Sequence, residues 1–260
     1  SGSKDKGYVV RVVPKNFEYT PFPKVKEAKD KQLLEALGSL SAKARLSAQY
    51  ELLQRPHDNT APEVLKMAMN DQLPLEVRIA SLFTYAQMSG KGGLDNLVQL
   101  SKDPKLQEFA LKALSDRVEW VKAVPLTPFL EGIKSPSDWV KAAAIIGMGR
   151  LGNPEAIPAL LQIKVPSSFV APEMGTEGPH ATPNSDIILP HLTVKALVRL
   201  NAVDACVNAL GTENQDLALW ALRYMHDPKA VNGLIAAYNK TGDNSNAVEG
   251  AVSTLNNKNG

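Results

Sequence analysis

The chain has 260 residues, of which 44% are hydrophobic and 22% are charged, as is ordinary for a soluble globular protein. Its formal net charge of +2 argues against a dedicated binder of nucleic acid or anionic membranes. The single cysteine, Cys206, excludes an intrachain disulfide and a multi-cysteine metal site. No apolar run approaches the roughly 18 to 20 residues that a membrane span needs.

Residues 1–25 are predicted to precede the helical part of the chain. The first three residues, Ser-Gly-Ser, are typical of a tag remnant, so the sequence is uninformative about an export signal. The run Gly7–Val13 is rich in β-branched residues and is followed by a proline, which predicts one short strand. We expect this strand to be the end of a preceding β domain. The aromatic and proline residues of Pro14–Pro23 predict an extended segment that lies on the first helices.

Residues 26–260 are predicted to form one helical domain, because clusters of Gly, Pro, Asp and Asn separate segments with helical spacing. Helices are predicted at Glu27–Leu37, Ala42–Arg55, Ala61–Met69, Pro74–Met88, Leu94–Ser101, Pro104–Ser115, Pro125–Ile133, Ser137–Leu151, Pro154–Ile163, Pro190–Asn201, Val203–Leu210, Asn214–His226, Pro228–Asn239 and Asn246–Leu255.

The clearest pair of helices spans Asp138–Lys164. The first of the two is predicted to end at Gly152, which tolerates a left-handed C-cap, and Pro154 suits the first turn of the second. Such a pair cannot bury its apolar faces alone. Copies must therefore stack on each side of it.

Aligning the second helix of each predicted hairpin brings small residues to one shared position. These are Ala48, Ser81, Ala110, Ala144, Thr193 and Ala218, and four positions later follow Leu52, Tyr85, Leu114, Met148, Leu197 and Leu222. Small residues let neighbouring helices approach closely, and the bulkier residue one turn later fills the groove between them. The pattern predicts an all-α fold, an α-solenoid of about six to seven hairpins stacked as a right-handed superhelix.

The motifs Val77-Arg78 and Val140-Lys141 and the run LGNPEAIPALL resemble HEAT-type repeats, and the resemblance covers about residues 26–255. The family typically carries a basic residue near the start of the second helix. This residue is matched at Arg45, Arg78 and Lys141 and replaced by Gln107, Pro190 and Gln215. A regular ladder of charges along the stack is therefore not expected. The resemblance implies a non-catalytic scaffold that binds protein.

A second resemblance concerns the runs LPHLTVKALVRLNAVDACVNAL and LWALRYMHDPKAVNGLIAAY. They are similar to the helical repeat region of large exported bacterial proteins labelled membrane-bound or sorbosone-type dehydrogenases. In these proteins a β-propeller precedes the repeats, and a c-type cytochrome or a sugar-related β domain often follows. The run GYVVRVVPKNF is similar to the last propeller strand. The resemblance implies a periplasmic or otherwise exported spacer whose partners are neighbouring domains of the same polypeptide.

A run rich in Pro, Gly, Ser and Thr, residues 165–188, separates two predicted helices. Loops longer than about 12 to 15 residues in a compact domain are usually functional or disordered. Two interpretations remain open for this insertion. It is either a surface excursion, or a lip over the groove of the solenoid that docks another domain.

No catalytic, cofactor-binding or metal-binding set is predicted. The four histidines lack metal-ligand spacing, although His180 and His191 flank Asp186. The run Gly147–Gly152 spells GxGxxG, but its glycines fall within and at the end of a predicted helix. They therefore indicate close packing and a C-cap. Cys206 lies in the middle of a predicted helix, which is typical of a buried apolar residue.

A groove lined by the second helices would collect the aromatic and basic residues Trp120, Trp139, Trp220, Arg150, Arg199 and Arg223. HEAT-like DNA glycosylases hold damaged bases on such a face, which gives the alternative function. The near-neutral charge disfavours it. Trp139 is predicted to be a packing anchor. The predicted interaction surface comprises His180, Asp186, His191, Trp139, Trp220 and Arg223. Its partner is a neighbouring domain or another protein, and the oligomeric state is left open.

Overall fold

The structure, a computed structural model, describes residues 10–19, 21–166 and 186–241. These residues form α-helices and short 3-10 helices, and none of them lies in a β-strand. The α-helices are α1 (Asp30–Leu37), α2 (Ala42–Leu53), α3 (Ala61–Met69), α4 (Leu75–Ser89), α5 (Leu94–Leu100), α6 (Gln107–Ser115), α7 (Thr127–Gly132), α8 (Asp138–Leu151), α9 (Ile157–Leu160), α10 (Ile188–Arg199), α11 (Val203–Ala209), α12 (Gln215–Met225) and α13 (Lys229–Thr241). The 3-10 helices are η1 (Gly90–Gly93), η2 (Val121–Ala123) and η3 (Pro154–Ala156). The predicted all-α class is confirmed.

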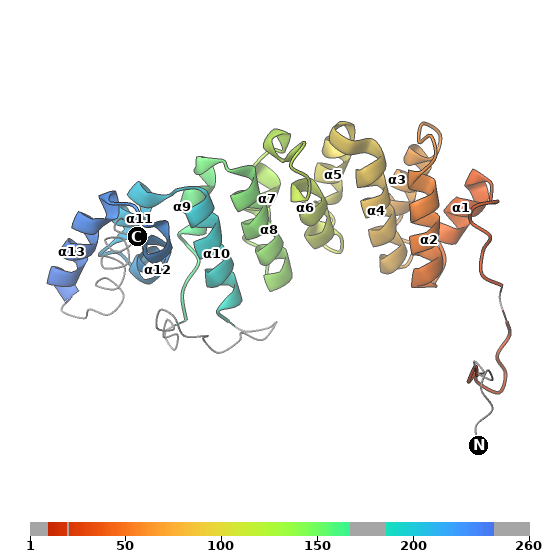
Figure 1. Cartoon of the computed structure of the whole chain (residues 1–260), viewed down its shortest axis with the longest axis horizontal. Helices are drawn as coiled ribbons and strands as arrows, with labels where there is room; N and C mark the ends of the chain where they lie inside the picture. Colours follow the sequence, from red (N-terminus) through yellow and green to blue (C-terminus); the bar gives the residue numbers. More distant parts are fainter. Residues whose placement is uncertain (1–9, 20, 167–185, 242–260) are drawn as a thin grey trace, which may run out of the picture.

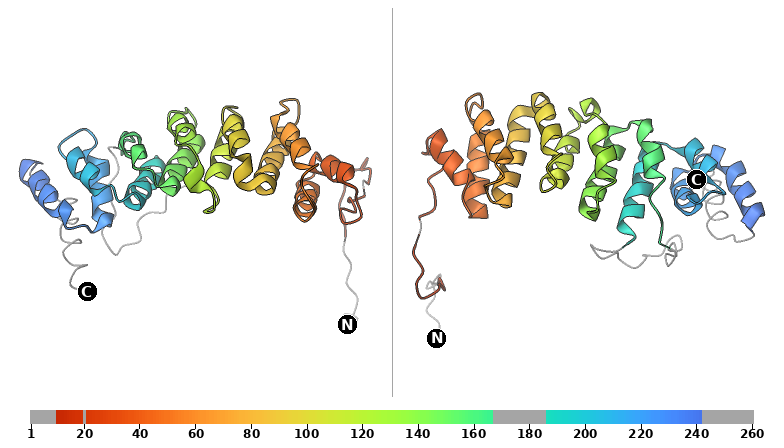
Figure 2. Two further views of the ribbon diagram at one scale, coloured as in Figure 1. Left: turned by 90° about the horizontal axis from the view of Figure 1, so that it is seen from above. Right: turned by 180° about the vertical axis from the view of Figure 1, so that it is seen from behind.

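The helices pair into hairpins that stack in one elongated row, with α1 and α13 at opposite ends (Figure 1). Views from above and from behind show the same row (Figure 2). The packed pairs are α1 with α2, α3 with α4, α5 with α6, α7 with α8, α9 with α10 and α11 with α12. Helix α13 packs on α11. This architecture is the predicted α-solenoid.

The second helices of the hairpins form a layer of their own, in which α2, α4, α6, α8, α10 and α12 each contact the next. The six aligned small residues are all 0% exposed. The bulkier residues four positions later are also buried, with Tyr85 the most exposed at 5%. The predicted register of the second helices is therefore confirmed.

The glycines of the GMGRLG run lie where neighbouring helices come close to α8. A Cβ atom added at Gly147 would lie 2.1 Å from the ring of Phe129 in α7. One added at Gly149 would lie 3.1 Å from the Cα atom of Ala196 in α10. Gly152 follows α8 with a φ of 68°, the left-handed C-cap that was predicted. The run is thus a helix with its cap.

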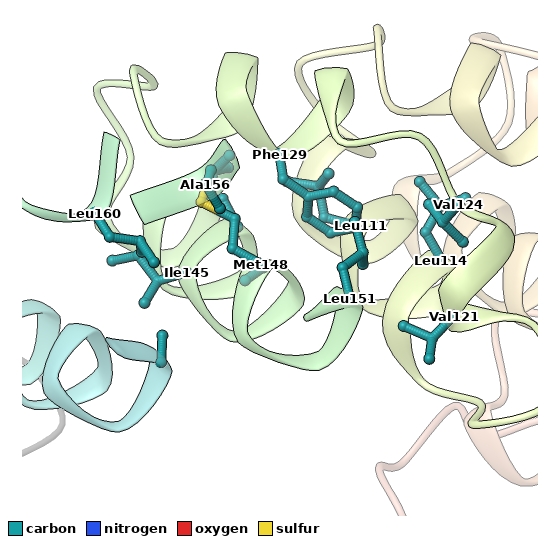
Figure 3. Close-up of a cluster of buried hydrophobic side chains, with 14 of the residues drawn as sticks. Leu111, Leu114, Val121, Val124, Phe129, Ile145, Met148, Leu151, Ala156 and Leu160 are labelled. Carbon is teal, nitrogen blue, oxygen red and sulfur yellow. The ribbon is translucent and has the colours of Figure 1, made fainter. Parts of the chain in front are cut away.

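The core is continuous along the stack. Figure 3 shows side chains of one apolar cluster that come from four consecutive helices, namely Leu111 and Leu114 of α6, Phe129 of α7, Ile145 and Met148 of α8, and Leu160 of α9. Each of these side chains is 0% exposed. A hairpin therefore buries its apolar face against its neighbours, as expected for a repeat that is unstable alone.

A buried cation joins the second hairpin to the third. Arg78 of α4 is 2% exposed, and its Nε donates to the carbonyl oxygen of Ala68 in α3 at 3.0 Å. Its Nη2 donates at 2.5 Å to Oδ2 of Asp103, in the turn between α5 and α6. Burial raises the pKa of Asp103, but hydrogen bonds from Arg78 and from the main-chain N–H of Lys105 outweigh it. The pKa of this carboxyl is therefore lowered.

The other two matched basic residues, Arg45 and Lys141, do not form such a contact between hairpins. Nη1 of Arg45 donates to the carbonyl oxygen of Ser39 at 2.8 Å, just before α2 begins. Lys141 pairs with Asp138 at 3.0 Å within the first turn of α8. Both contacts remain inside one hairpin, so these three positions form no regular ladder.

The predicted N-terminal strand is wrong for its described part, residues 10–13, which form no strand. Val10 and Val12 are 81% and 95% exposed. A strand needs a neighbour for its backbone N–H and C=O groups, and none of the described segments supplies one. Residues 7–9 lie outside the described part of the chain.

The segment that follows is only partly where it was predicted. The guanidinium carbon of Arg11 lies 4.8 Å from the ring centroid of Phe17 and 5.4 Å from that of Tyr19. Figure 1 shows this part of the chain leading away from α1, so it does not cover the first helices. Closer to the fold, Nζ of Lys43 in α2 lies 5.5 Å from the ring centroid of Phe22.

The remaining helix boundaries agree with prediction to within a few residues. Helix α10 begins at Ile188 instead of Pro190, because proline is tolerated in the first turn of a helix. Helix α9 is short because η3 replaces its first turn. The predicted helix Asn246–Leu255 and residues 167–185 of the insertion lie outside the described residues.

Candidate interaction surface

The second helices turn one face toward the core and the opposite face away from it. Since an α-helix turns about 100° per residue, the residues two before and two after the buried small residue lie almost opposite to it. We call these residues the outward strip: Leu46 and Tyr50 on α2, Ile79 and Phe83 on α4, Glu108 and Lys112 on α6, Ala142 and Ile146 on α8, His191 and Lys195 on α10, and Asp216 and Trp220 on α12. Because each second helix contacts the next, the strip runs along the row.

The strip is apolar on α2 and α4. Leu46 and Tyr50 are each 66% exposed, whereas Ile79 and Phe83 are partly buried. The ring of Phe83 meets that of Phe109 in α6 edge to face, with centroids 6.4 Å apart and planes at 86°. The apolar surface therefore continues from α4 onto α6.

On α6 the strip becomes charged. Nζ of Lys112 pairs with the carboxylate of Glu108 one turn earlier. It also lies 5.6 Å from the ring centroid of Phe109, within the range of a cation–π contact. The two charges neutralise each other, so α6 adds no net charge to the strip at these positions.

Helix α8 returns to apolar residues, and here a prediction is corrected. Trp139 is 53% exposed, so its predicted role as a packing anchor is wrong. It lies five residues before the buried Ala144, which places it on the same side of the helix as Ile146, itself 37% exposed. The outward side of α8 thus presents a tryptophan and an isoleucine to solvent.

Helix α10 presents basic side chains. His191, Lys195 and Arg199 are exposed and follow one another at intervals of four residues. Burial lowers the pKa of His191, and the charge of Lys195 lowers it further. The imidazole of His191 therefore stays neutral down to a lower pH than that of an ordinary histidine. The positive charge of this face therefore comes from Lys195 and Arg199.

The structure brings together only part of the predicted interaction surface. The rings of His191 and Trp220 lie 6.1 Å apart at an angle of 52°. Trp220 is 8% exposed and Arg223 2%, so these two side chains belong to the interior and offer a partner little area. Asp186 is exposed in the turn before α10, and His180 lies outside the described residues.

The sequence prediction does not include the exposed apolar residues of the outward strip, namely Leu46, Tyr50 and Ile146. The signal was present, because each lies two residues from an aligned small residue.

The described residues contain no cluster of three or more His, Cys, Asp and Glu side chains suited to a metal ion. Cys206 is 0% exposed, and burial raises the pKa of its thiol to about 12. An open cleft of about 510 Å³ lies between the start of α6 and the turn before α8. The charged residues of its lining are Lys105, Glu108, Glu131 and Lys134, and the lining contains no histidine or cysteine. The lining also contains the hydroxyl groups of Ser135 and Ser137.

Comparison with protein families identifies one repeat in the sequence. Residues 140–164 match the family described as PBS lyase HEAT-like repeat. The match contains most of α8, its cap at Gly152, η3 and α9. Comparison with the curated proteins finds no match. The matched repeat and the helical stack together support a HEAT-type helical repeat domain, an architecture suited to protein interaction or a scaffold role.

Among the described helices, none combines the length and the apolar character that a membrane crossing requires.

Proposed function

We propose that the chain is a non-catalytic scaffold that binds protein through the outward strip. The observation that carries the proposal is the 66% exposure of Leu46 and Tyr50 beside the partly buried rings of α4 and α6. The core is complete without these side chains, so stability alone does not account for them. Exposed apolar surface that continues over several elements is typical of protein-binding sites.

The proposal extends to the context of the chain. We infer a spacer in a larger, exported, carbohydrate-related oxidoreductase-type protein of the bacterial periplasm, where it holds neighbouring domains at a fixed separation. The support is the resemblance of residues 189–210 and 219–238 to the repeat region of such proteins. An elongated row of hairpins also suits a spacer, because its two ends lie far apart (Figure 1).

The test is capture of partners from a cell-envelope extract of the source organism, with identification by mass spectrometry. The double variant Leu46→Glu/Tyr50→Glu removes the apolar strip on α2. The matched control Leu40→Glu/Val118→Glu introduces the same charges at exposed apolar residues in turns, 77% and 79% exposed. Both pairs are on the surface, so neither variant is expected to unfold the chain.

The scaffold proposal predicts a specific protein that the unchanged chain and the control capture and the strip variant loses. Equal capture by all three proteins, or none by any, contradicts it. The proposed role as a spacer is supported if the captured partner, or the natural polypeptide that contains this chain, carries a propeller, cytochrome or sugar-related domain. Any other partner contradicts the context and leaves the scaffold role standing.

A further inference from the structure

Cationic and apolar side chains meet where α8 and α10 pack together. These helices approach closely at Gly149, where an added Cβ would lie 3.1 Å from Cα of Ala196 and 4.0 Å from Cδ of Arg199. The Arg199 side chain therefore reaches α8 at Gly149, the residue before Arg150, which occupies the equivalent position on α8. We call Trp139, Ile146, Arg150, Lys195 and Arg199 the basic seam.

The cations of the basic seam are not neutralised within the described part of the chain. Helix α10 contains no acidic residue, and no described carboxylate lies within ion-pair distance of Lys195 or Arg199. Nη1 of Arg150 donates to the carbonyl oxygen of Ser115 at 3.3 Å, a contact that leaves its charge in place.

Nearby carboxylates are engaged elsewhere. Asp138 of α8 pairs with Lys141, and Asp116, which follows α6, lies 3.5 Å from Arg117. The seam therefore carries three positive charges in an otherwise nearly neutral chain.

Apolar surface adjoins these charges. Trp139 is 53% and Ile146 37% exposed on the same side of α8. Ile146 lies one turn before Arg150, and Trp139 lies two turns further along the same side of α8. Tryptophan and arginine are both residue types that protein interfaces favour for their central contacts. Charge and apolar area together specify a ligand that brings carboxylates and an apolar side chain.

We propose that the basic seam binds an acidic peptide segment of a protein partner, with an apolar side chain of that segment placed on Trp139 and Ile146. Carboxylates of the segment pair with Arg199 and Lys195, and the planar guanidinium groups accept them in two-point hydrogen bonds. The inference rests on the proposed scaffold function, because it names the chemistry of a partner on the same outward face.

A nucleic acid fits the seam less well. Non-specific affinity for nucleic acid comes from neutralising many phosphates along a track. Beyond α10, the next second helix offers Asp216 at its outward position, which would repel a phosphate backbone. An acidic peptide needs only the few cations that the seam supplies.

The test measures fluorescence anisotropy of three labelled probes of equal length: a Glu/Asp-rich peptide with a central Leu-Phe pair, the same peptide with Lys in place of the acids, and a single-stranded DNA oligonucleotide. The protein is used as the full chain. The variant Lys195→Glu/Arg199→Glu reverses the seam, and Lys31→Glu/Lys102→Glu makes the same charge change at exposed lysines on other hairpins. Helical circular dichroism confirms that both variants are folded.

We expect the acidic peptide to bind, the seam variant to weaken its binding at least about tenfold, and the control to leave it within about twofold. Trp139→Ala is expected to weaken it about fivefold. Equal loss in both charge variants, or no binding of the acidic peptide, overturns the inference. Tighter binding of DNA with a steep salt dependence that the seam variant abolishes overturns it in favour of nucleic acid. In each of these cases the capture experiment on Leu46 and Tyr50 still decides the scaffold proposal.

Discussion

The ion pair between Arg78 and Asp103 links two consecutive hairpins. The change Asp103→Asn leaves a buried guanidinium without its carboxylate, while a hydrogen bond to Ala68 remains. We expect the free energy of unfolding to fall by about 1–3 kcal/mol, measured by urea denaturation. The exposed residue Asp58 provides the control, and Asp58→Asn is expected to change stability by less than about 0.5 kcal/mol. An equal change in the free energy of unfolding for the two variants would show that the ion pair between Arg78 and Asp103 is not formed.

The same pair predicts a dependence of stability on pH. The pKa of Asp103 in the folded chain lies below its ordinary value of 3.8, so the unfolded chain takes up this proton at higher pH. The stabilisation is therefore fully present above that ordinary value and is lost as the pH falls through the lowered pKa. The stability difference between the natural chain and Asp103→Asn is expected to shrink steadily with acidification below pH 3.8. A difference that grows in acid would contradict this assignment.

At the residue scale, sequence reasoning succeeded where the evidence is local. The cap at Gly152 and the burial of Cys206 follow from their immediate neighbours along the chain. The partner of Arg78 lies 25 positions away, in a turn, and no local pattern identifies it. The prediction for Trp139 is wrong because its position around α8 decides its exposure: it lies on the side away from the buried Ala144, although large aromatic residues are more often buried.

At the scale of the helix, Ala144 marks how closely α7 and α8 pack. A Cβ atom at Gly132 of α7 would lie only 3.1 Å from the Cβ of Ala144. The change Ala144→Leu is therefore expected to overpack this contact and to lower the free energy of unfolding by about 1–3 kcal/mol. The thermal midpoint measures the effect. Ala142→Leu makes the same change on the outward side of the same helix, and an equal loss there would contradict the register.

The helices were predictable because each is bounded by residues that stop helices and carries its small residue at a fixed spacing. The N-terminal strand was not, since β-branched residues favour a strand only where another strand can pair with it. Val10–Val13 has no such neighbour among the described residues.

At the scale of the whole molecule, one alignment accounts for both the core and the surface. The small residue of each second helix faces the neighbouring helices, and the residues two positions away lie on the opposite side, where they are exposed or partly buried except for Trp220 of α12. The stack therefore converts a repeated pattern into a continuous strip, apolar toward α2 and basic toward α10. The fold followed from the sequence because the buried pattern repeats. The surface did not, because its residues differ from one hairpin to the next.

The labelling rate of single introduced cysteines tests this two-sided arrangement most directly. Cys206 gives little background, because burial raises its thiol pKa to about 12. Tyr50→Cys and Ile146→Cys occupy the outward strip, and Ala48→Cys and Ala144→Cys occupy the buried position two residues away. We expect the outward cysteines to react with a thiol reagent at least about a hundredfold faster, since the buried ones react only after local opening. Equal rates within each pair would contradict the arrangement of the second helices, and with it the interaction surface built on them.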